Sequence, residues 1–232
     1  MRVEQQPAFV LHARPYRETS LLLDVFTRDF GRVGIVARGA RGERSRLQRG
    51  VLQALQPLLL DWVQRGELGT LVSAEATGMP LLPAAEALYA TLYINELVVR
   101  LCGRNDPHER AFTAYADCLA ALAAGHDAAW TLRRFERDFL AALGYGLVLE
   151  RTAAGGPVEA DREYGYDPED GPVAVRADGM RIAGAALLAL ARDGRPEADH
   201  LEQLRRLVRH VVRHLVGGEL NAWRMVRPAS RR

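Results

Sequence analysis

The spacing of apolar residues changes once along this chain, and the change limits the folds that it can adopt. As far as about residue 76, apolar and β-branched residues gather in short runs that end at turn-forming residues such as Pro15, Gly31 and Gly39. Beyond Pro83 they recur every three or four residues, which is the period of an amphipathic helix. The chain is therefore predicted to have a multidomain α+β fold, in which a β-domain precedes a helical one.

Five strands are expected in residues 1–80. They are assigned to residues 9–14, 20–27, 32–37, about 56–62 and 69–76, with Arg65-Gly66-Glu67 as a hairpin turn. Five strands in so short a segment predict a small barrel of the size of an OB-fold, a fold with a face that binds nucleic acid. We therefore expect an OB-fold domain at residues 1–80.

Helices are expected to fill most of residues 81–232. They are predicted at residues 84–101, about 107–123, 127–143, 184–191 and 197–216. The third begins with Asp127 as its N-cap and ends before Gly144, as capping preferences indicate. Residues 150–181 are rich in Gly, Asp, Glu and Pro. They are expected to form an inserted loop or β-ribbon, with candidate strands at residues 163–166 and 173–175.

The arginines gather at the two ends of the chain. The net charge is only +2, yet residues 1–50 have ten arginines against five acids and residues 201–232 have eight against two. Acids outnumber arginines between these segments. Two basic ends indicate an anionic partner such as a phosphate backbone. Solvated arginines that only keep the protein soluble are the weaker alternative.

All 31 Lys or Arg residues are arginine, because the chain contains no lysine. This excludes a P-loop lysine, a lysine Schiff base and a lysine general base. The planar, always charged guanidinium suits phosphate recognition. A GC-rich codon bias would produce the same composition without any function, and the two explanations carry equal weight.

Catalytic and metal-binding motifs are missing from the sequence. Neither G-x-S-x-G nor G-x-G-x-x-G occurs, and His210 and His214 stand one helical turn apart without further ligands. Asp167, Glu169 and Asp170 do not match a calcium loop, so a solvated turn is expected there. We therefore expect a protein that is not an enzyme, with no metal and no cofactor.

The sequence also predicts a cellular compartment. Both cysteines, Cys102 and Cys118, fall in apolar helical segments, which is typical of packed, reduced thiols. The N-terminus lacks an apolar signal region, and no apolar run is long enough to span a bilayer. A cytoplasmic protein is expected, with no membrane partner.

The densest group of arginines lies between Arg28 and Arg49, where seven arginines face two acids. It contains Arg38-Gly39-Ala40-Arg41-Gly42, in which glycines let the backbone approach a phosphate while guanidiniums neutralise it. This pattern favours a nucleic-acid-binding loop over a solvated turn. Few aromatic residues are available for base stacking, and each is expected in the core: Tyr16, Phe30 and Trp62. Binding should therefore depend mainly on charge.

The helix expected at residues 197–216 carries a second basic surface. Its apolar residues recur at helical spacing and are expected to face inward. The arginines that this leaves on the outer face are Arg205, Arg206, Arg209 and Arg213.

Several segments resemble the bacterial recombination mediator RecO family. In the N-terminal half these are Ala8-Phe-Val-Leu-His-Ala-Arg-Pro-Tyr-Arg-Glu-Thr-Ser20, Asp24-Val-Phe-Thr27, Gly31-Arg-Val33 and Ala37-Arg-Gly-Ala-Arg41. In the helical half they are Leu92-Tyr-Ile-Asn-Glu-Leu97, Leu132-Arg-Arg-Phe-Glu136, Leu143-Gly-Tyr-Gly146 and Leu215 to Val226. The resemblance covers nearly the whole chain, and its motifs occur in the family's order.

The resemblance implies an OB-fold followed by a helical domain, together with a function in the RecF pathway of DNA repair and homologous recombination. It implies binding to single- and double-stranded DNA, annealing of complementary strands, and recruitment by the C-terminal tail of the single-strand-binding protein SSB. With RecR, such a protein would help RecA to replace SSB, and it would be associated with the nucleoid.

The resemblance also suggests site residues. Arg14, Arg17, Arg38 and Arg41 lie in matched motifs and are expected to contact DNA, whereas Arg44, Arg46 and Arg49 are assigned by charge alone. The basic outer face of residues 197–216 is the candidate for a second strand. Arg133 and Arg134 are the candidates for the acidic SSB tail, although either could instead pair with Glu96 or Glu136. Some relatives hold zinc with four cysteines after the Leu-Gly-Tyr motif; residues 150–171 contain none, so no structural zinc is expected.

Two other functions remain open at this point. OB-like barrels also bind RNA, so an RNA-binding module of the transcription or translation apparatus is the alternative. A hydrolase with acids in residues 150–170 is less favoured, because no nucleophile, base or metal set accompanies them.

Overall fold

The computed structural model describes residues 1–42, 50–177 and 179–225. It contains two compact units, residues 1–125 and 126–232, which are treated separately below. The change from strands to helices follows residue 80, as the sequence pattern indicated. The first unit nevertheless continues through two helices beyond that point, and these helices bring a loop to the barrel that is important for the site.

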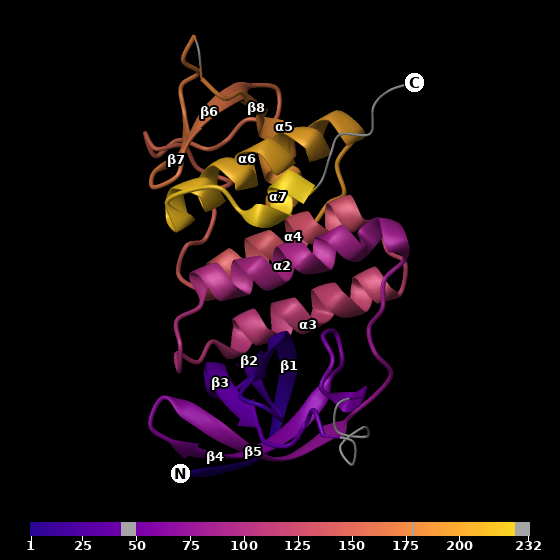
Figure 1. The fold of residues 1–232 in the computed structure, drawn as a ribbon. Helices are drawn as coiled ribbons and strands as arrows, with labels where there is room; N and C mark the ends of the chain where they lie inside the picture. The colour runs from indigo at the N-terminus through magenta and orange to yellow at the C-terminus, as the bar shows by residue number, and fades with distance from the viewer. Residues whose placement is uncertain (43–49, 178, 226–232) are drawn as a thin grey trace. The chain divides into compact units, whose positions relative to one another are not determined.

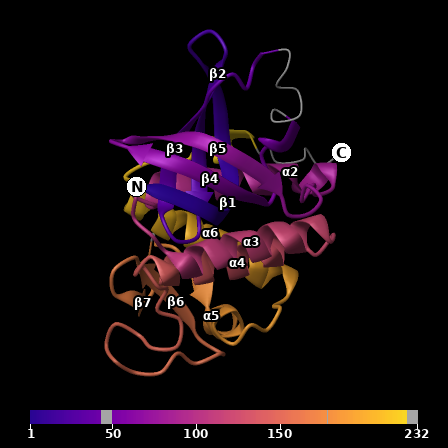
Figure 2. The same cartoon turned by 90° about the horizontal axis from the view of Figure 1, so that it is seen from below.

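Residues 1–80 form a closed five-stranded barrel (Figure 1). Its strands are β1 (Arg2–Tyr16), β2 (Ser20–Thr27), β3 (Gly31–Ala37), β4 (Leu58–Arg65) and β5 (Leu68–Ala76). They follow the order β1-β2-β3-β5-β4, and every neighbouring pair is antiparallel except β3 with β5. Figure 2 shows these strands from another side. The predicted OB-fold is confirmed.

Alternation of side chains along the strands fills the barrel. Leu23, Val25 and Ile35 point inward and are completely buried, while Asp24 and Gly34, which alternate with them along β2 and β3, face outward. Trp62 is also fully buried, and its ring meets Phe30 edge-on at 5.3 Å between centroids. Trp62 therefore belongs to the core, as expected, and Phe30 is partly buried against it. Tyr16, which was also expected in the core, is only partly buried.

Strand β1 begins earlier than its apolar pattern indicated. Its first residues pair with β4, where Val3 lies opposite Trp62. The register shifts between Val3 and Gln6, and Gln5 has a φ of 51°. Such a bulge interrupts the alternation of apolar and polar residues. The sequence therefore showed only the regular part of this strand.

Helices α2 (Leu88–Leu101) and α3 (Glu109–Ala123) complete the first unit, after the short 3-10 helix η2 (Ala85–Ala87). Phe112 and Tyr115 of α3 pack on Phe9 and Phe26 of the barrel, with centroids 5.4–5.8 Å apart. The Tyr115 hydroxyl also donates to Oδ1 of Asn95 in α2 at 2.6 Å. Helix α3 therefore covers the part of β1 and β2 that is distant from the β1–β2 turn (Figure 1).

The second unit combines helices with a small sheet. Its helices are α4 (Ala128–Ala142), α5 (Gly184–Ala191), α6 (Ala198–Val216) and α7 (Asn221–Met225). Its strands β6 (Glu163–Asp167), β7 (Gly171–Val173) and β8 (Ile182–Ala183) form a sheet in the order β7-β6-β8. Asp127 caps α4 by accepting from the backbone N–H of Trp130 at 3.1 Å, as expected.

The β-ribbon predicted within residues 150–181 is present, with differences at its edges. Strand β7 begins at Gly171 and ends at Val173, so the candidate strand at residues 173–175 was placed too late. The additional short strand β8 and helix α7 were not expected, because segments this short carry no periodic pattern. Along the parts of the chain that the structure describes, no helix is long and apolar enough to cross a membrane.

Candidate nucleic-acid interface

One row of outward-facing residues crosses four strands of the barrel. Arg14 lies opposite Leu22, Leu22 opposite Val36, and Val36 opposite Thr70. Paired residues of neighbouring strands lie on the same face of a sheet. The row therefore places a guanidinium beside a partly exposed, uncharged surface on the barrel face that OB-folds use for oligonucleotides.

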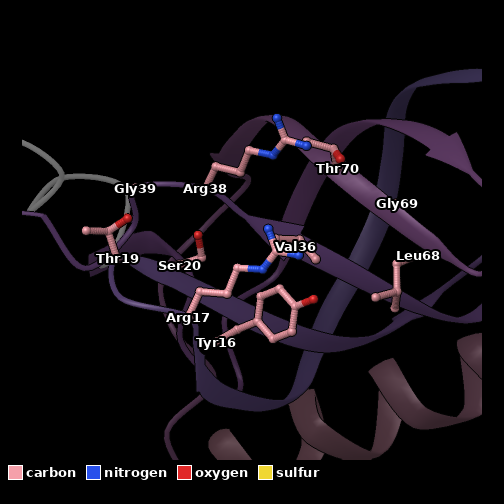
Figure 3. A pocket seen from close by; sticks show the side chains of 10 residues that line it. All are labelled: Tyr16, Arg17, Thr19, Ser20, Val36, Arg38, Gly39, Leu68, Gly69 and Thr70. Carbon is pink, nitrogen blue, oxygen red and sulfur yellow. The ribbon is translucent and has the colours of Figure 1, made fainter.

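A cavity of about 530 Å³ opens at the end of this row (Figure 3). The β1–β2 turn contributes Arg17 and Thr19, the end of β3 contributes Arg38, and β5 contributes Leu68 and Thr70. Figure 3 shows the side chains of Arg17 and Arg38 extending in the same direction, with the ring of Tyr16 next to Arg17. Two guanidiniums thus line one cavity whose other side chains carry no charge.

Arg41 connects the two loops that carry these arginines. Its backbone N–H donates to the carbonyl of Thr19 at 2.8 Å, and its Nη1 donates to the carbonyl of Arg17 at 3.3 Å. Arg17 and Gly39 both have positive φ values, of 53° and 67°, which turn the chain sharply at these points. Arg41 therefore holds Arg17 in place in addition to supplying charge.

Four arginines gather at this end of the barrel. Among the residues that the structure describes, none of Arg14, Arg17, Arg38 and Arg41 forms an ion pair with a carboxylate. The Arg17 guanidinium lies 5.3 Å from the centroid of the Tyr16 ring. Three other arginines of the barrel do pair with acids: Arg2 with Glu4, Arg28 with Asp29, and Arg32 with Asp24. Arg14, Arg17, Arg38 and Arg41 therefore keep a positive charge that no described carboxylate neutralises.

The arginine-rich segment from Arg28 to Arg49 divides into two parts. Arg28 lies in the β2–β3 turn, at the opposite end of β2 from the cavity, and donates to Asp29 at 2.8 Å. That hydrogen bond lowers the pKa of Asp29 and raises the pKa of Arg28. Arg38 and Arg41 belong to the cavity end. Arg44, Arg46 and Arg49 lie outside the described residues, so their assignment stays a prediction.

The basic face of α6 is partly neutralised within its own unit. Leu204, Leu207 and Val208 are buried, so its arginines face outward as expected. Arg205 pairs with Glu202 at 2.7 Å, while Arg209 and Arg213 both donate to Glu219. Arg209 also lies over the ring of Trp223, 4.7 Å from its centroid. Arg206 is exposed and forms no ion pair with any described residue.

Replacing Glu219 with glutamine should release the charges of Arg209 and Arg213. Their hydrogen bonds hold the pKa of Glu219 below its usual range, so this carboxylate is ionised at neutral pH. If α6 contacts DNA, E219Q should bind single strands several-fold more tightly, and the slope of log affinity against log salt should steepen by about 1.4 for two contacts.

Fluorescence anisotropy over a salt series measures both quantities for E219Q. E202Q is the graded control, because it releases only Arg205 and should steepen the slope by about half as much. Unchanged slopes in both variants would remove α6 from the DNA-binding surface.

The two candidate arginines for the SSB tail have different surroundings. Arg133 is only 5% exposed and donates to Oε1 of Glu136 at 2.6 Å, which is one of the pairings expected as the alternative. Arg134 donates to Asp193 at 2.7 Å, and about half of its side chain is exposed. Of the two, Arg134 is the more accessible to an acidic tail, and the assignment of the tail to this region stays a prediction.

Reactive and metal-binding groups show ordinary structural surroundings. Cys102 and Cys118 are buried thiols, and burial raises the pKa of Cys102 to about 12. The carboxylate of Asp167 accepts from the backbone N–H groups of Glu169 and Asp170, which lowers its pKa. Within residues 1–42, 50–177 and 179–225, no three His, Cys, Asp or Glu side chains are grouped so that they could hold a metal ion.

Comparison with known proteins finds the same family along the whole chain. A family model described as the N-terminal part of recombination protein O matches residues 1–80, and a second model of its C-terminal part matches residues 83–224. The chain is 41% identical to the DNA repair protein RecO of Xanthomonas euvesicatoria pv. vesicatoria over 100% of both chains. It is 46% identical to that of Aromatoleum aromaticum over 94% of this chain and 92% of the relative.

Proposed function

The chain belongs to the recombination protein O family of DNA repair proteins, and on this premise we propose that it anneals complementary DNA strands and helps RecA to replace SSB on single-stranded DNA. The observation that carries the proposal is the cavity at the β1–β2 turn. It brings Arg17 and Arg38 together, and neither forms an ion pair with a described acid. Such a site fits a phosphate backbone.

The proposed mechanism is electrostatic. Two complementary strands repel each other because both carry a phosphate charge at every nucleotide, and salt only partly screens this repulsion. A strand held on the barrel face by Arg14, Arg17 and Arg38 has part of its charge neutralised, so a second strand can approach and pair. Tyr16 is the aromatic residue that lines the cavity, and it is partly exposed. Phosphate contacts and stacking on an aromatic ring both tolerate different bases, so strands of different sequence should bind alike.

Other parts of the chain complete the proposal. The outer face of α6 would hold the second strand, with Arg206 ready for contact and the other three arginines exchanging their carboxylate partners for phosphates. The SSB tail would bind near Arg134. RecR would assist in loading RecA, in the RecF pathway, and the protein would act at the nucleoid.

Annealing of SSB-coated complementary strands tests recruitment through the tail. The protein should accelerate pairing of strands coated with intact SSB, and the acceleration should be lost with SSB that lacks its acidic C-terminal tail. R134Q should show the same loss with intact SSB while annealing bare strands normally. If removal of the SSB tail does not change the acceleration, recruitment through the tail is wrong. If removal of the tail abolishes the acceleration but R134Q still anneals strands coated with intact SSB as the wild type does, the tail binds elsewhere.

The alternative of an RNA-binding module is not favoured by the family match. Affinities for DNA and RNA strands of one sequence, measured at fixed salt, would decide between them. Preference for RNA would overturn the proposed function.

A further inference from the structure

Arg104 is distant from the N-terminal arginines in sequence, yet the fold brings it to the barrel. It lies in the loop between α2 and α3, and this loop is fastened to the start of β3. The backbone N–H of Asn105 donates to the carbonyl of Arg32 at 2.9 Å, and Arg104 forms an isolated parallel bridge with Arg32. The loop backbone also fits against Gly31, where a Cβ would lie only 2.0 Å from the carbonyl oxygen of Asp106.

Gly34 makes room for the Arg104 guanidinium on the outer face of β3. A Cβ added at Gly34 would lie 2.8 Å from Nη1 of Arg104 and 2.7 Å from Cδ2 of Leu68. Both distances are too short for ordinary contacts. The guanidinium therefore occupies the space that a side chain at this strand position would need.

This position continues the surface that begins at the cavity. Gly34 pairs with Leu68 and Val36 pairs with Thr70 in the parallel β3–β5 ladder, and these residues share the outer face. Leu68 and Thr70 line the cavity with Arg17 and Arg38. Arg104 thus lies beside a cavity-lining residue, on the same face of the barrel.

The charge of Arg104 is available to a ligand. Half of its side chain is exposed, and its ion-pair partner among the described residues, Asp24, is 3.8 Å away. The same carboxylate lies closer to Arg32, at 3.4 Å, and Arg32 is largely buried. One carboxylate therefore serves two guanidiniums, which leaves positive charge on the more exposed one.

We propose that Arg104 contacts a phosphate of the DNA strand held at Arg17 and Arg38, and that Gly34 is the residue that positions it. The inference rests on the proposed DNA-binding function and extends it: the helical half of the chain contributes to the barrel's binding face. Arg104 lies in an acidic part of the chain, outside the basic ends, so the charge pattern of the sequence did not indicate it. A track from the β1–β2 turn to the α2–α3 loop would guide one strand across the barrel.

The test is binding of single-stranded DNA by fluorescence anisotropy over a salt series. R104Q should lose about 10-fold in affinity, and its log–log salt slope should be shallower by about 0.7, the value for one phosphate contact. R104K keeps the charge and should keep the wild-type slope. R28Q is the control for net charge: it also removes one arginine from the barrel, but Arg28 is paired with Asp29 at 2.8 Å and does not line the cavity, so the slope should be unchanged.

Gly34 provides a variant that keeps every charge. G34A introduces no forbidden backbone angle and presses only on two flexible side-chain ends, so it should fold. Its affinity for single-stranded DNA should fall by a smaller factor than that of R104Q, about 3-fold, because Arg104 is displaced while its charge remains. The double variant G34A/R104Q should bind no more weakly than R104Q, because Gly34 acts through Arg104.

The outcomes separate this inference from the proposed function. If R17Q/R38Q loses affinity while R104Q matches R28Q, the inference is wrong and the proposed function stands. If R17Q/R38Q also matches R28Q, the cavity does not bind DNA, and both are wrong. If G34A and R104Q lose affinity additively, Gly34 acts independently, and its positioning role is wrong.

Discussion

Replacing Arg17 and Arg38 with glutamate is expected to lower the affinity for single-stranded DNA by at least about 100-fold at moderate salt. The estimate assigns each guanidinium one charge-assisted hydrogen bond to a phosphate, worth about 1.5–3 kcal/mol. Both side chains line one cavity and neither pairs with a described carboxylate, so wild-type binding gains their full charge. Annealing of bare complementary strands should be lost in parallel.

The fold of R17E/R38E should remain intact, because both side chains are exposed and neither donates a hydrogen bond that the structure records. The charge-matched control is R162E/R181E, which changes two exposed arginines on the ribbon of the second unit. If the control loses as much affinity as R17E/R38E, the effect comes from net charge alone, and the cavity is not the DNA site. Circular dichroism spectra of both variants should match that of the wild type.

Arg41 has a different expected behaviour from its neighbours, and sequence alone could not show this. The motif match and the local charge identified Arg14, Arg17, Arg38 and Arg41 as one group. The structure places the first three at the outer surface, whereas Arg41 fastens the loop that carries Arg17. Substitution of Arg41 should therefore weaken binding through both charge and loop position.

Local patterns were sufficient for most of the fold. Strand β2 and helix α5 have the predicted ends, because turn-forming residues and clear periodicity bound them. The OB-fold followed from the number and length of the strands. Pairing between distant segments was not visible in the same way: the bulged start of β1 exists because it pairs with β4, and its own residues do not alternate.

The charge of a site depends on contacts that a sequence does not reveal. Arg205, Arg209 and Arg213 were predicted to form a free basic face, and their helical spacing was right. Their charges are partly neutralised because the chain turns back after α6 and brings Glu219 to two of them. Arg104 shows the opposite relation between sequence and charge. It belongs to a segment with an excess of acids, yet its loop reaches the barrel and leaves positive charge exposed there.

Replacing Gly31 with alanine is expected to destabilise the first unit by about 3–4 kcal/mol, which is the largest stability change predicted here. Two costs add at this position. The backbone has a φ of 65°, which costs a residue with a Cβ about 1–2 kcal/mol. The new Cβ would also overlap the Asp106 carbonyl, and backbone atoms there cannot move aside as a flexible side chain would.

A substitution at Gly39 allows the two costs to be measured separately. It has nearly the same φ, 67°, but a Cβ added there would meet no heavy atom within 4 Å. G39A should therefore lose only the conformational part, about 1–2 kcal/mol, in urea unfolding. The additional loss in G31A measures the attachment of the α2–α3 loop to the barrel. Equal losses in the two variants would show that this loop is not held at β3. Because the same attachment carries Arg104, G31A should also bind DNA with the shallower salt slope of R104Q.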